Sequence, residues 1–324
     1  MVQAIFFILI GFVLLIKGAD WLVSGASSIA KKLHIPEIVI GLTVVSLGTS
    51  MPELFVSTTS AINGHPDMAI GNVIGSNACN LLLILGLASS IRRIKFQRET
   101  RLIEIPMCLV FTIIFLIFCN TQNQISRIEG IVLLALFVCF IGYTIFMAIK
   151  GEKFDEEDDS EDDAEKGNKN EIENLSILKN IFLVIIGVLA LKFGGDFTVD
   201  NAVYIAEYFK LSEQIISLTI LAVGTSLPEL VTSVMAAIKG NSDIAIGNII
   251  GSNIFNMLFI IGTTALIHPI TYSVKYNIDM TVVIISTIIL TLFPLIPPKN
   301  MMSKRNGAAY LVMYGLYLIL MFNV

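Results

Sequence analysis

Residues 42–86 read LTVVSLGTSMPELFVSTTSAINGHPDMAIGNVIGSNACNLLLILG, and residues 218–262 read LTILAVGTSLPELVTSVMAAIKGNSDIAIGNIIGSNIFNMLFIIG. A constant offset of 176 residues aligns the two stretches without a gap, and about 25 of the 45 positions are identical. Each copy places a glutamate (Glu53, Glu229) and an asparagine (Asn80, Asn256) inside apolar sequence. Because an ionisable group within a bilayer is costly and usually functional, the repeat predicts a duplicated half-site for something charged.

The composition indicates an all-α integral membrane protein. Hydrophobic residues make up 55% of the 324 residues, and the mean hydropathy is +0.81. Apolar runs recur along nearly the whole chain, as in proteins that cross a bilayer several times. The first apolar run has no basic region before it and exceeds signal-peptide length, so it predicts a retained transmembrane helix. The four cysteines lie in apolar segments without CxxC spacing, which disfavours a disulfide framework or a zinc site.

Apolar stretches bounded by charges or by Pro and Gly clusters predict ten transmembrane helices. They are expected at residues 3–30, 37–62, 68–91, 103–119, 128–149, 178–206, 213–238, 244–267, 277–296 and 307–323. Five precede an acidic segment and five follow it, so the second set enters the membrane with opposite polarity. The chain is therefore predicted to consist of two inverted five-helix repeats, residues 1–150 and 175–324.

Loop charges predict the orientation of these helices. With both termini outside, the outside loops hold only three basic residues, Arg127, Lys210 and Lys275, whereas the inside loops hold twelve. At equivalent positions, the first copy of the repeat is followed by Arg92 and the second by His268. Basic residues accumulate on the cytoplasmic side of membrane proteins, so this bias predicts a multi-pass protein of the plasma (inner) membrane with its termini outside.

Residues 151–174 form a low-complexity acidic segment between the two halves. Residues 152–173 carry 12 acidic and 3 basic side chains, which predicts a solvated cytoplasmic linker rather than a folded domain. A calcium-sensing role is the less favoured alternative, because the segment lacks the glycine and ligand spacing of an EF-hand loop.

The motifs GTSMPE (Gly48–Glu53) and GTSLPE (Gly224–Glu229) predict that helices 2 and 7 are broken near the middle of the membrane. Pro52 and Pro228 lack an amide donor, and the preceding glycines allow a bend. A broken helix frees backbone carbonyls, which can coordinate a cation in a cavity. Hydroxyl groups next to the carbonyls add further oxygen donors: Thr49, Ser50, Thr225 and Ser226. Hard oxygen donors with two carboxylates suit Ca²⁺, Na⁺ or Mg²⁺ rather than zinc or copper, and flexible coordination favours Ca²⁺ over Mg²⁺.

The motifs GNVIGSNACN (71–80) and GNIIGSNIFN (247–256) predict a polar stripe on each following helix. Ser76 and Asn80 are four residues apart and share a face with Asn72, and Ser252 and Asn256 repeat the spacing. We expect each stripe to face the glutamate of the partner span and to contribute to an ion site. The alternative is that these polar groups are hydrogen-bonding contacts between helices.

The first and sixth predicted spans also correspond at the same offset. Both carry small residues that allow helices to approach closely: Gly18, Ala19, Gly25, Ala26, Gly194 and Gly195. These residues could provide a smooth surface for sliding or could simply pack tightly. Asp20 and Asp196 are expected outside the central site, as gate or helix-end charges paired with Lys17 and Lys192.

The paired motifs resemble the alpha repeats of the cation/calcium antiporter superfamily, which includes the sodium/calcium exchangers, and the prokaryotic branch fits best. The resemblance implies that Glu53 and Glu229 ligate Ca²⁺ together with the backbone carbonyls of Thr49 and Thr225. It also implies flanking Na⁺ sites formed by Ser46, Thr49, Ser50, Glu53 and Ser76 and by Ala222, Thr225, Ser226, Glu229 and Ser252. Asn80 and Asn256 would line the centre. Several family members have an aspartate in place of Asn256, so the number of Na⁺ ions and any K⁺ co-transport stay open.

The predicted function is secondary antiport of Ca²⁺ against Na⁺ by alternating access. The resemblance implies that the first and sixth spans are the mobile pair. A monomer is expected to suffice, with no permanently bound cofactor and no nucleic-acid partner. A Ca²⁺/H⁺ antiporter of the same fold is the alternative, and a passive cation channel is less favoured because channels usually surround their filter with identical subunits. No HExxH or G-x-S-x-G motif is present, and no histidine lies mid-membrane, so an enzyme is not expected.

Overall fold

The computed structural model describes residues 2–63, 67–150, 177–209, 222–295 and 299–323. The first half contains these elements: α1 (Val2–Lys32), α2 (Glu37–Ile40), the π-helical η1 (Gly41–Val45), α3 (Ser46–Thr49), α4 (Met51–Ile62), α5 (Asp67–Ala78), the π-helical η2 (Cys79–Ile84), α6 (Leu85–Ile91), β1 (Ile94–Lys95), the π-helical η3 (Thr100–Glu104), α7 (Ile105–Thr121), β2 (Gln124–Ile125) and α8 (Arg127–Lys150). The second half contains these elements: α9 (Ile177–Tyr208), α11 (Ala222–Thr225), α12 (Leu227–Lys239), α13 (Ser242–Phe255), the π-helical η6 (Asn256–Ile260), α14 (Ile261–Ile267), β3 (Ile270–Thr271), α15 (Tyr276–Leu292), the 3-10 turn η7 (Phe293–Leu295), β4 (Met301–Met302) and α16 (Lys304–Asn323).

The predicted helical spans agree with the observed helices to within about three residues wherever the chain is described. Within those residues, seven helices are long and apolar enough to cross a membrane, and the bent pair α2–α3 and α4 makes an eighth. The acidic segment at 151–174 and the start of the seventh predicted span, 213–221, lie outside the described residues.

The predicted break in helix 2 is confirmed, and it occurs at Ser50. The helix bends by 48° there, between Thr49 and Met51. Ser226 has nearly the same backbone angles (φ −87°, ψ 7°) as Ser50 (φ −84°, ψ 9°) and separates α11 from α12. Pro52 and Pro228 fall in the first turn of the following helix, where a missing amide costs nothing because that amide has no acceptor within the helix.

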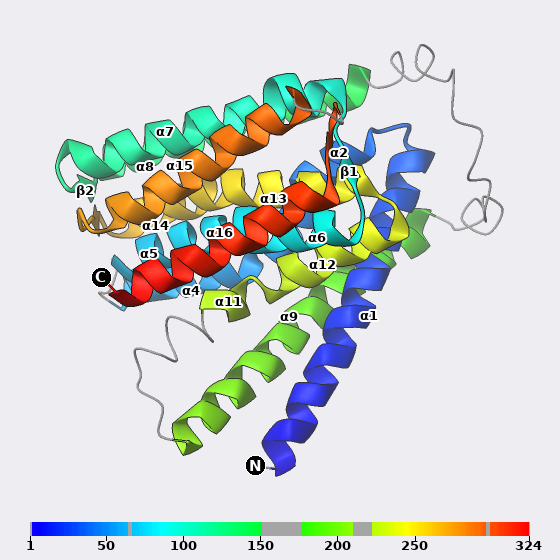
Figure 1. The fold of residues 1–324 in the computed structure, drawn as a ribbon, viewed down its shortest axis with the longest axis horizontal. Helices are drawn as coiled ribbons and strands as arrows, with labels where there is room; N and C mark the ends of the chain where they lie inside the picture. The colour runs from blue at the N-terminus through cyan, green and yellow to red at the C-terminus, as the bar shows by residue number, and fades with distance from the viewer. Residues whose placement is uncertain (1, 64–66, 151–176, 210–221, 296–298, 324) are drawn as a thin grey trace.

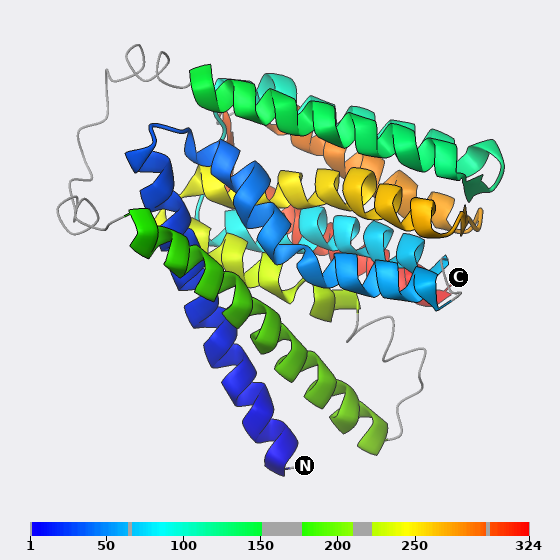
Figure 2. The same cartoon turned by 180° about the vertical axis from the view of Figure 1, so that it is seen from behind.

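The two helices that carry the polar stripes form the centre of the molecule. The most apolar stretch of α13–α14 is 94% buried and that of α5–α6 is 72% buried, compared with 28% for α1 and 22% for α8. Helices α7, α8 and α15 lie on one side of this centre, and α1 and α9 lie on the other (Figures 1 and 2). The polar residues of the stripes are therefore enclosed by protein, as buried polar groups in a membrane must be.

Two short antiparallel strand pairs lie at opposite ends of the bundle and connect its two halves (Figure 1). In one pair Ile94 of β1 lies opposite Met302 of β4, and in the other Ile125 of β2 lies opposite Ile270 of β3. Each pair therefore joins one strand from each half of the chain. The two pairs are equivalent under the offset of the repeat, because β1 corresponds to β3 and β2 corresponds closely to β4.

Helices α1 and α9 run antiparallel and contact each other through glycines, and they extend obliquely from the rest of the bundle (Figure 2). A Cβ atom added at Gly18 would lie 2.9 Å from the carbonyl oxygen of Gly187, and one added at Gly194 would lie 2.8 Å from that of Gly11. These two contacts are related by the offset of 176 residues. Gly18 and Gly194 therefore hold α1 and α9 to each other, as small residues do at close helix crossings in membranes.

Replacement of Gly18 by alanine is expected to lower the thermal unfolding midpoint of the purified protein in detergent. The added methyl group meets backbone atoms of α9, which cannot move aside as a flexible side chain can, and overpacking of this kind costs about 1–3 kcal/mol. Gly142 on α8 is a matched control, because a Cβ atom there meets nothing within 4 Å. Equal midpoints for Gly18→Ala and Gly142→Ala would contradict the close contact.

Candidate cation-binding site

The two glutamates of the repeat lie in the first turn after each helix break. Glu53 belongs to α4 and Glu229 to α12, and each side chain is only 1% exposed. A new helix begins directly after each break, at Met51 and at Leu227. Each glutamate therefore lies at the amino-terminal end of its helix. A negative charge at this end is favoured by the helix dipole.

Serines from opposite repeats hold the two carboxylates in one site. The Ser50 hydroxyl donates to Glu229 Oε1 over 2.8 Å, and the Ser226 hydroxyl donates to Glu53 Oε1 over 3.3 Å. Ser50 corresponds to Ser226, and Glu53 corresponds to Glu229, under the offset of 176 residues. The same serine–glutamate contact is therefore formed once by each repeat. Ser76 of α5 adds a third donor to Glu53 Oε1, at 3.4 Å. The structure therefore brings both glutamates, both serines and Ser76 together, although they are up to 179 residues apart in sequence.

Several buried oxygen atoms of the predicted site residues have no hydrogen-bond donor among the described residues. They are Oε2 of Glu53, Oε2 of Glu229, Oδ1 of Asn80, Oδ1 of Asn256 and Oγ of Ser252. Buried polar atoms in proteins are nearly always paired, so unpaired oxygens on the predicted site residues are positions where a cation could supply the missing interaction. Among the described residues, no group of three or more His, Cys, Asp or Glu side chains is placed to hold a metal ion. The donor set of two carboxylates with amides and hydroxyls thus suits a hard cation rather than zinc or copper.

Four asparagines link the two central helices. Asn80 Nδ2 donates to Asn253 Oδ1 and Asn256 Nδ2 donates to Asn77 Oδ1, both over 3.0 Å. These bonds use the amide nitrogens of Asn80 and Asn256, so their carbonyl oxygens are the atoms left unpaired. Asn77 and Asn253 were not among the predicted site residues. The signal that could have found them is their place in both copies of the motif GSNxxN.

Asn72 and Asn248 form an outer layer that also connects the repeats. Asn248 accepts a bond from Thr49 Oγ1 over 3.1 Å and donates to Ser233 Oγ over 2.9 Å. In the same way, Asn72 accepts a bond from Thr225 Oγ1 over 3.5 Å and donates to Ser57 Oγ over 3.2 Å. Both polar stripes therefore contact the broken helices of both repeats. Ser57 and Ser233 are further residues that the sequence patterns did not indicate.

The remaining predicted ligands lie next to this network. Ser46 is buried, and its hydroxyl donates back to the carbonyl of Leu42 over 2.8 Å. Ala222 begins α11, four residues before the break at Ser226. The proposed ligation by the Thr49 and Thr225 carbonyls stays a prediction.

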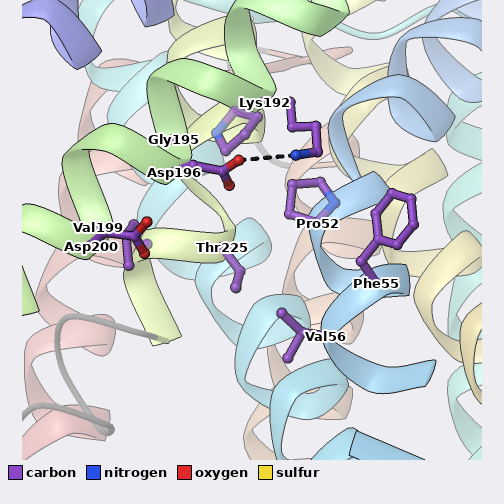
Figure 3. A pocket seen from close by; sticks show the side chains of 11 residues that line it. Pro52, Phe55, Val56, Lys192, Gly195, Asp196, Val199, Asp200 and Thr225 are labelled. Carbon is purple, nitrogen blue, oxygen red and sulfur yellow. Dashed lines mark hydrogen bonds and ion pairs between the residues drawn. The ribbon is translucent and has the colours of Figure 1, made fainter. Parts of the chain in front are cut away.

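A pocket of about 520 Å³ lies beside the helix break at Ser226 (Figure 3). Its walls come from α4, α9, α11 and the start of α12: Pro52, Phe55, Val56, Lys192, Gly195, Asp196, Val199, Asp200, Gly224, Thr225 and Pro228. Thr225 lies on its wall, next to the break that carries Ser226. The pocket therefore ends beside the break at Ser226, and Asp196 and Asp200 lie on its wall.

One of the two predicted ion pairs is correct and the other is wrong. Asp196 pairs with Lys192 at 3.0 Å, one turn apart on α9 (Figure 3). Asp20 pairs instead with Lys239, whose Nζ lies 2.5 Å from Asp20 Oδ1. The reason is tertiary, because α12 packs against α1 and brings Lys239 to Asp20, whereas Lys17 lies on an exposed part of α1.

The family model described as "Sodium/calcium exchanger protein" matches residues 3–146 and 179–323 of the chain. The protein is a member of the sodium/calcium exchanger family. Inner membrane protein YrbG of Escherichia coli (strain K12) is 36% identical to this family member over 291 residues, which cover 88% of each chain. Sodium/calcium exchanger MaX1 of Methanosarcina acetivorans is 31% identical over 98% of each chain.

A solved structure of the sodium-calcium exchanger NCX_Mj, soaked with Na⁺ and Ca²⁺, is similar in fold. It has a TM-score of 0.83 and 30% sequence identity, and the match covers 98% of both chains. The resemblance to the cation/calcium antiporter superfamily, and to its YrbG-like prokaryotic branch, is confirmed. Together with the apolar helices, these relatives show that this exchanger-family protein is a multi-pass membrane protein.

Proposed function

We propose that this protein is a secondary antiporter that exchanges Ca²⁺ for Na⁺ across the membrane by alternating access. The carrying observation is the pair of buried carboxylates, Glu53 and Glu229, each held by a serine of the other repeat with one oxygen left unpaired. The printed names of MaX1 and NCX_Mj, a sodium/calcium exchanger and a sodium-calcium exchanger, support the choice of ions.

The charge of the site explains why exchange is obligatory. Two ionised carboxylates enclosed by protein carry a charge of −2, which one Ca²⁺ or a set of Na⁺ ions can neutralise. Burying that charge without a cation is costly, so the protein changes its access only when cations are bound. Ca²⁺ and Na⁺ compete for the same oxygens, and this competition couples the two fluxes.

The proposed architecture has ten spans in two inverted five-helix repeats, with both termini outside and the acidic linker in the cytoplasm. The contacts related by the offset of 176 support this arrangement, since the pairs Ser50–Glu229 and Ser226–Glu53 exchange the roles of the two repeats. The antiparallel contacts of α1 with α9 support it as well. One chain holds both half-sites, so a monomer is proposed to suffice for transport.

The test is Ca²⁺ flux in proteoliposomes of the purified protein. An outward Na⁺ gradient at fixed pH is expected to drive Ca²⁺ uptake, and collapse of the Na⁺ gradient with a sodium ionophore is expected to stop it. A H⁺ gradient imposed without Na⁺ tests the alternative coupling ion, because the two glutamates could carry protons. Uptake driven by H⁺ and indifferent to Na⁺ would replace sodium by protons in the proposal, and Ca²⁺ flux without any counter-ion would point to a channel.

A further inference from the structure

The two ends of the site differ in their access, although the repeat makes them equivalent in sequence. We name the end of the site that lies beside the pocket the pocket end, and the opposite end the closed end. At the pocket end Val56 is 40% exposed, whereas its counterpart at the closed end, Thr232, is 0% exposed. Thr225 lines the pocket, whereas its counterpart Thr49 is fully buried. Glu53 and Glu229 themselves are each 1% exposed, so the site is enclosed, but the protein around it is more open at the pocket end than at the closed end.

At the closed end, a lysine joins the tip of α12 to the middle of α1. Lys239 Nζ lies 2.5 Å from Asp20 Oδ1, donates to Ser24 Oγ over 2.7 Å and donates to the Asp20 carbonyl oxygen over 3.1 Å. Lys239 is the last residue of α12, which Gly240 ends in a left-handed conformation (φ 88°). The three contacts use all three donors of the ammonium group. They bind α1 to α12 at this end.

The counterpart of this contact at the pocket end contains no lysine. The offset of 176 residues relates Asp20 to Asp196, Ser24 to Asp200 and Lys239 to Asn63. Asn63 ends α4 as an exposed residue, and among the residues that the structure describes its side chain makes no bond to α9. If the pocket end closed by the mirror-image movement, α4 would present an amide to two carboxylates. At the closed end the ammonium group of Lys239 pairs with Asp20, but at the pocket end no ammonium group would stand in its place opposite Asp196.

We propose that Lys239, Asp20 and Ser24 form a latch that stabilises the state open toward the pocket end. In an ideal inverted repeat the two access states would have equal free energies, so any preference must come from residues that differ between the copies. The latch is such a difference. The inference rests on the alternating access of the proposed function, and on the predicted topology the latch lies at the cytoplasmic end.

The test is the reactivity of single cysteines at the two ends, measured without transport. Val56→Cys and Thr232→Cys are introduced separately into a chain in which Cys79, Cys108, Cys119 and Cys139 are replaced by serine or alanine. A membrane-impermeant maleimide is applied from each side of oriented vesicles. Adding Lys239→Gln is expected to slow labelling at position 56 and to speed labelling at position 232, changing the ratio of the two rates about threefold to fivefold.

Two further variants keep the proposal falsifiable. Asn63→Lys supplies the missing ammonium group opposite Asp196 and Asp200 and is expected to shift the ratio in the same direction as Lys239→Gln. Lys31→Gln removes an exposed charge from the same end of α1 and is expected to leave the ratio unchanged. Unchanged ratios in both Lys239→Gln and Asn63→Lys would overturn the latch. A shift in these ratios in a protein that shows no Na⁺-driven Ca²⁺ flux would retain the latch and reject the proposed ions.

Discussion

Replacement of Glu53 or Glu229 by glutamine is expected to reduce Na⁺-driven Ca²⁺ uptake at least about a hundredfold, because an uncompensated buried charge costs about 3–5 kcal/mol. Glutamine has nearly the same shape as glutamate but removes one of the two negative charges. Bound Ca²⁺ would then leave a net positive charge in a site that is almost fully enclosed. The amide also places a donor where an unpaired Oε2 atom now lies.

The measurement is initial ⁴⁵Ca²⁺ uptake by proteoliposomes that contain equal amounts of each purified variant. Glu99→Gln is the matched control, since it removes a carboxylate outside the site and is expected to keep the uptake of the parent protein. Monodisperse protein from both site variants would show that insertion and folding are intact. If both single variants, Glu53→Gln and Glu229→Gln, took up Ca²⁺ as fast as the parent protein, the cation site would lie elsewhere.

Replacement of Asn77 by leucine is expected to raise the Ca²⁺ concentration for half-maximal uptake about tenfold. Asn77 Oδ1 accepts the hydrogen bond of Asn256 Nδ2, and this bond leaves Asn256 Oδ1 as the unpaired atom. Loss of the acceptor leaves a buried donor unsatisfied, which costs about 1–3 kcal/mol. The amide of Asn256 would be free to rotate and to present its nitrogen to the cation. By the symmetry of the repeat, Asn253→Leu is expected to act in the same way through Asn80.

The control for this variant is Asn120→Leu. Asn120 also forms an amide pair between helices, with Asn277 at 3.0 Å, but the pair is exposed and remote from the glutamates. It is expected to leave the half-maximal Ca²⁺ concentration unchanged. If Asn77→Leu changed only the amount of folded protein and not the half-maximal concentration, Asn77 would be a packing residue with no role in orienting Asn256.

Much of the fold could be predicted from the sequence because its signals are local. Apolar runs of sufficient length predict spans in any membrane protein, and their predicted ends lie within about three residues of the observed helices. Proline after glycine also predicts a broken helix from local sequence, because the ring of Pro52 would clash with the carbonyl of Gly48 if the preceding helix continued. The duplication also predicted that Glu53 and Glu229 belong to one site, because a carboxylate buried in apolar sequence is costly and usually functional.

The pairings across the repeats could not be predicted, because they depend on how helices distant in sequence pack. The ion pair of Asp20 was expected with Lys17, one turn away, but α12 brings Lys239 closer. The roles of Asn77 and Asn253 likewise became visible only when α5 and α13 were placed face to face.

The sequence by itself determined that this protein crosses the membrane through two related halves and that each half contributes a carboxylate, since periodic apolar runs and a repeated motif are written along the chain. Only the tertiary structure decided that Ser50 binds Glu229 while Ser226 binds Glu53, and that a pocket lies beside the break at Ser226. The physical reason is that both copies of the motif encode nearly the same local conformation, so the chain alone cannot distinguish the open end from the closed one. That difference arises from contacts between helices, above all the contact of Lys239 with Asp20.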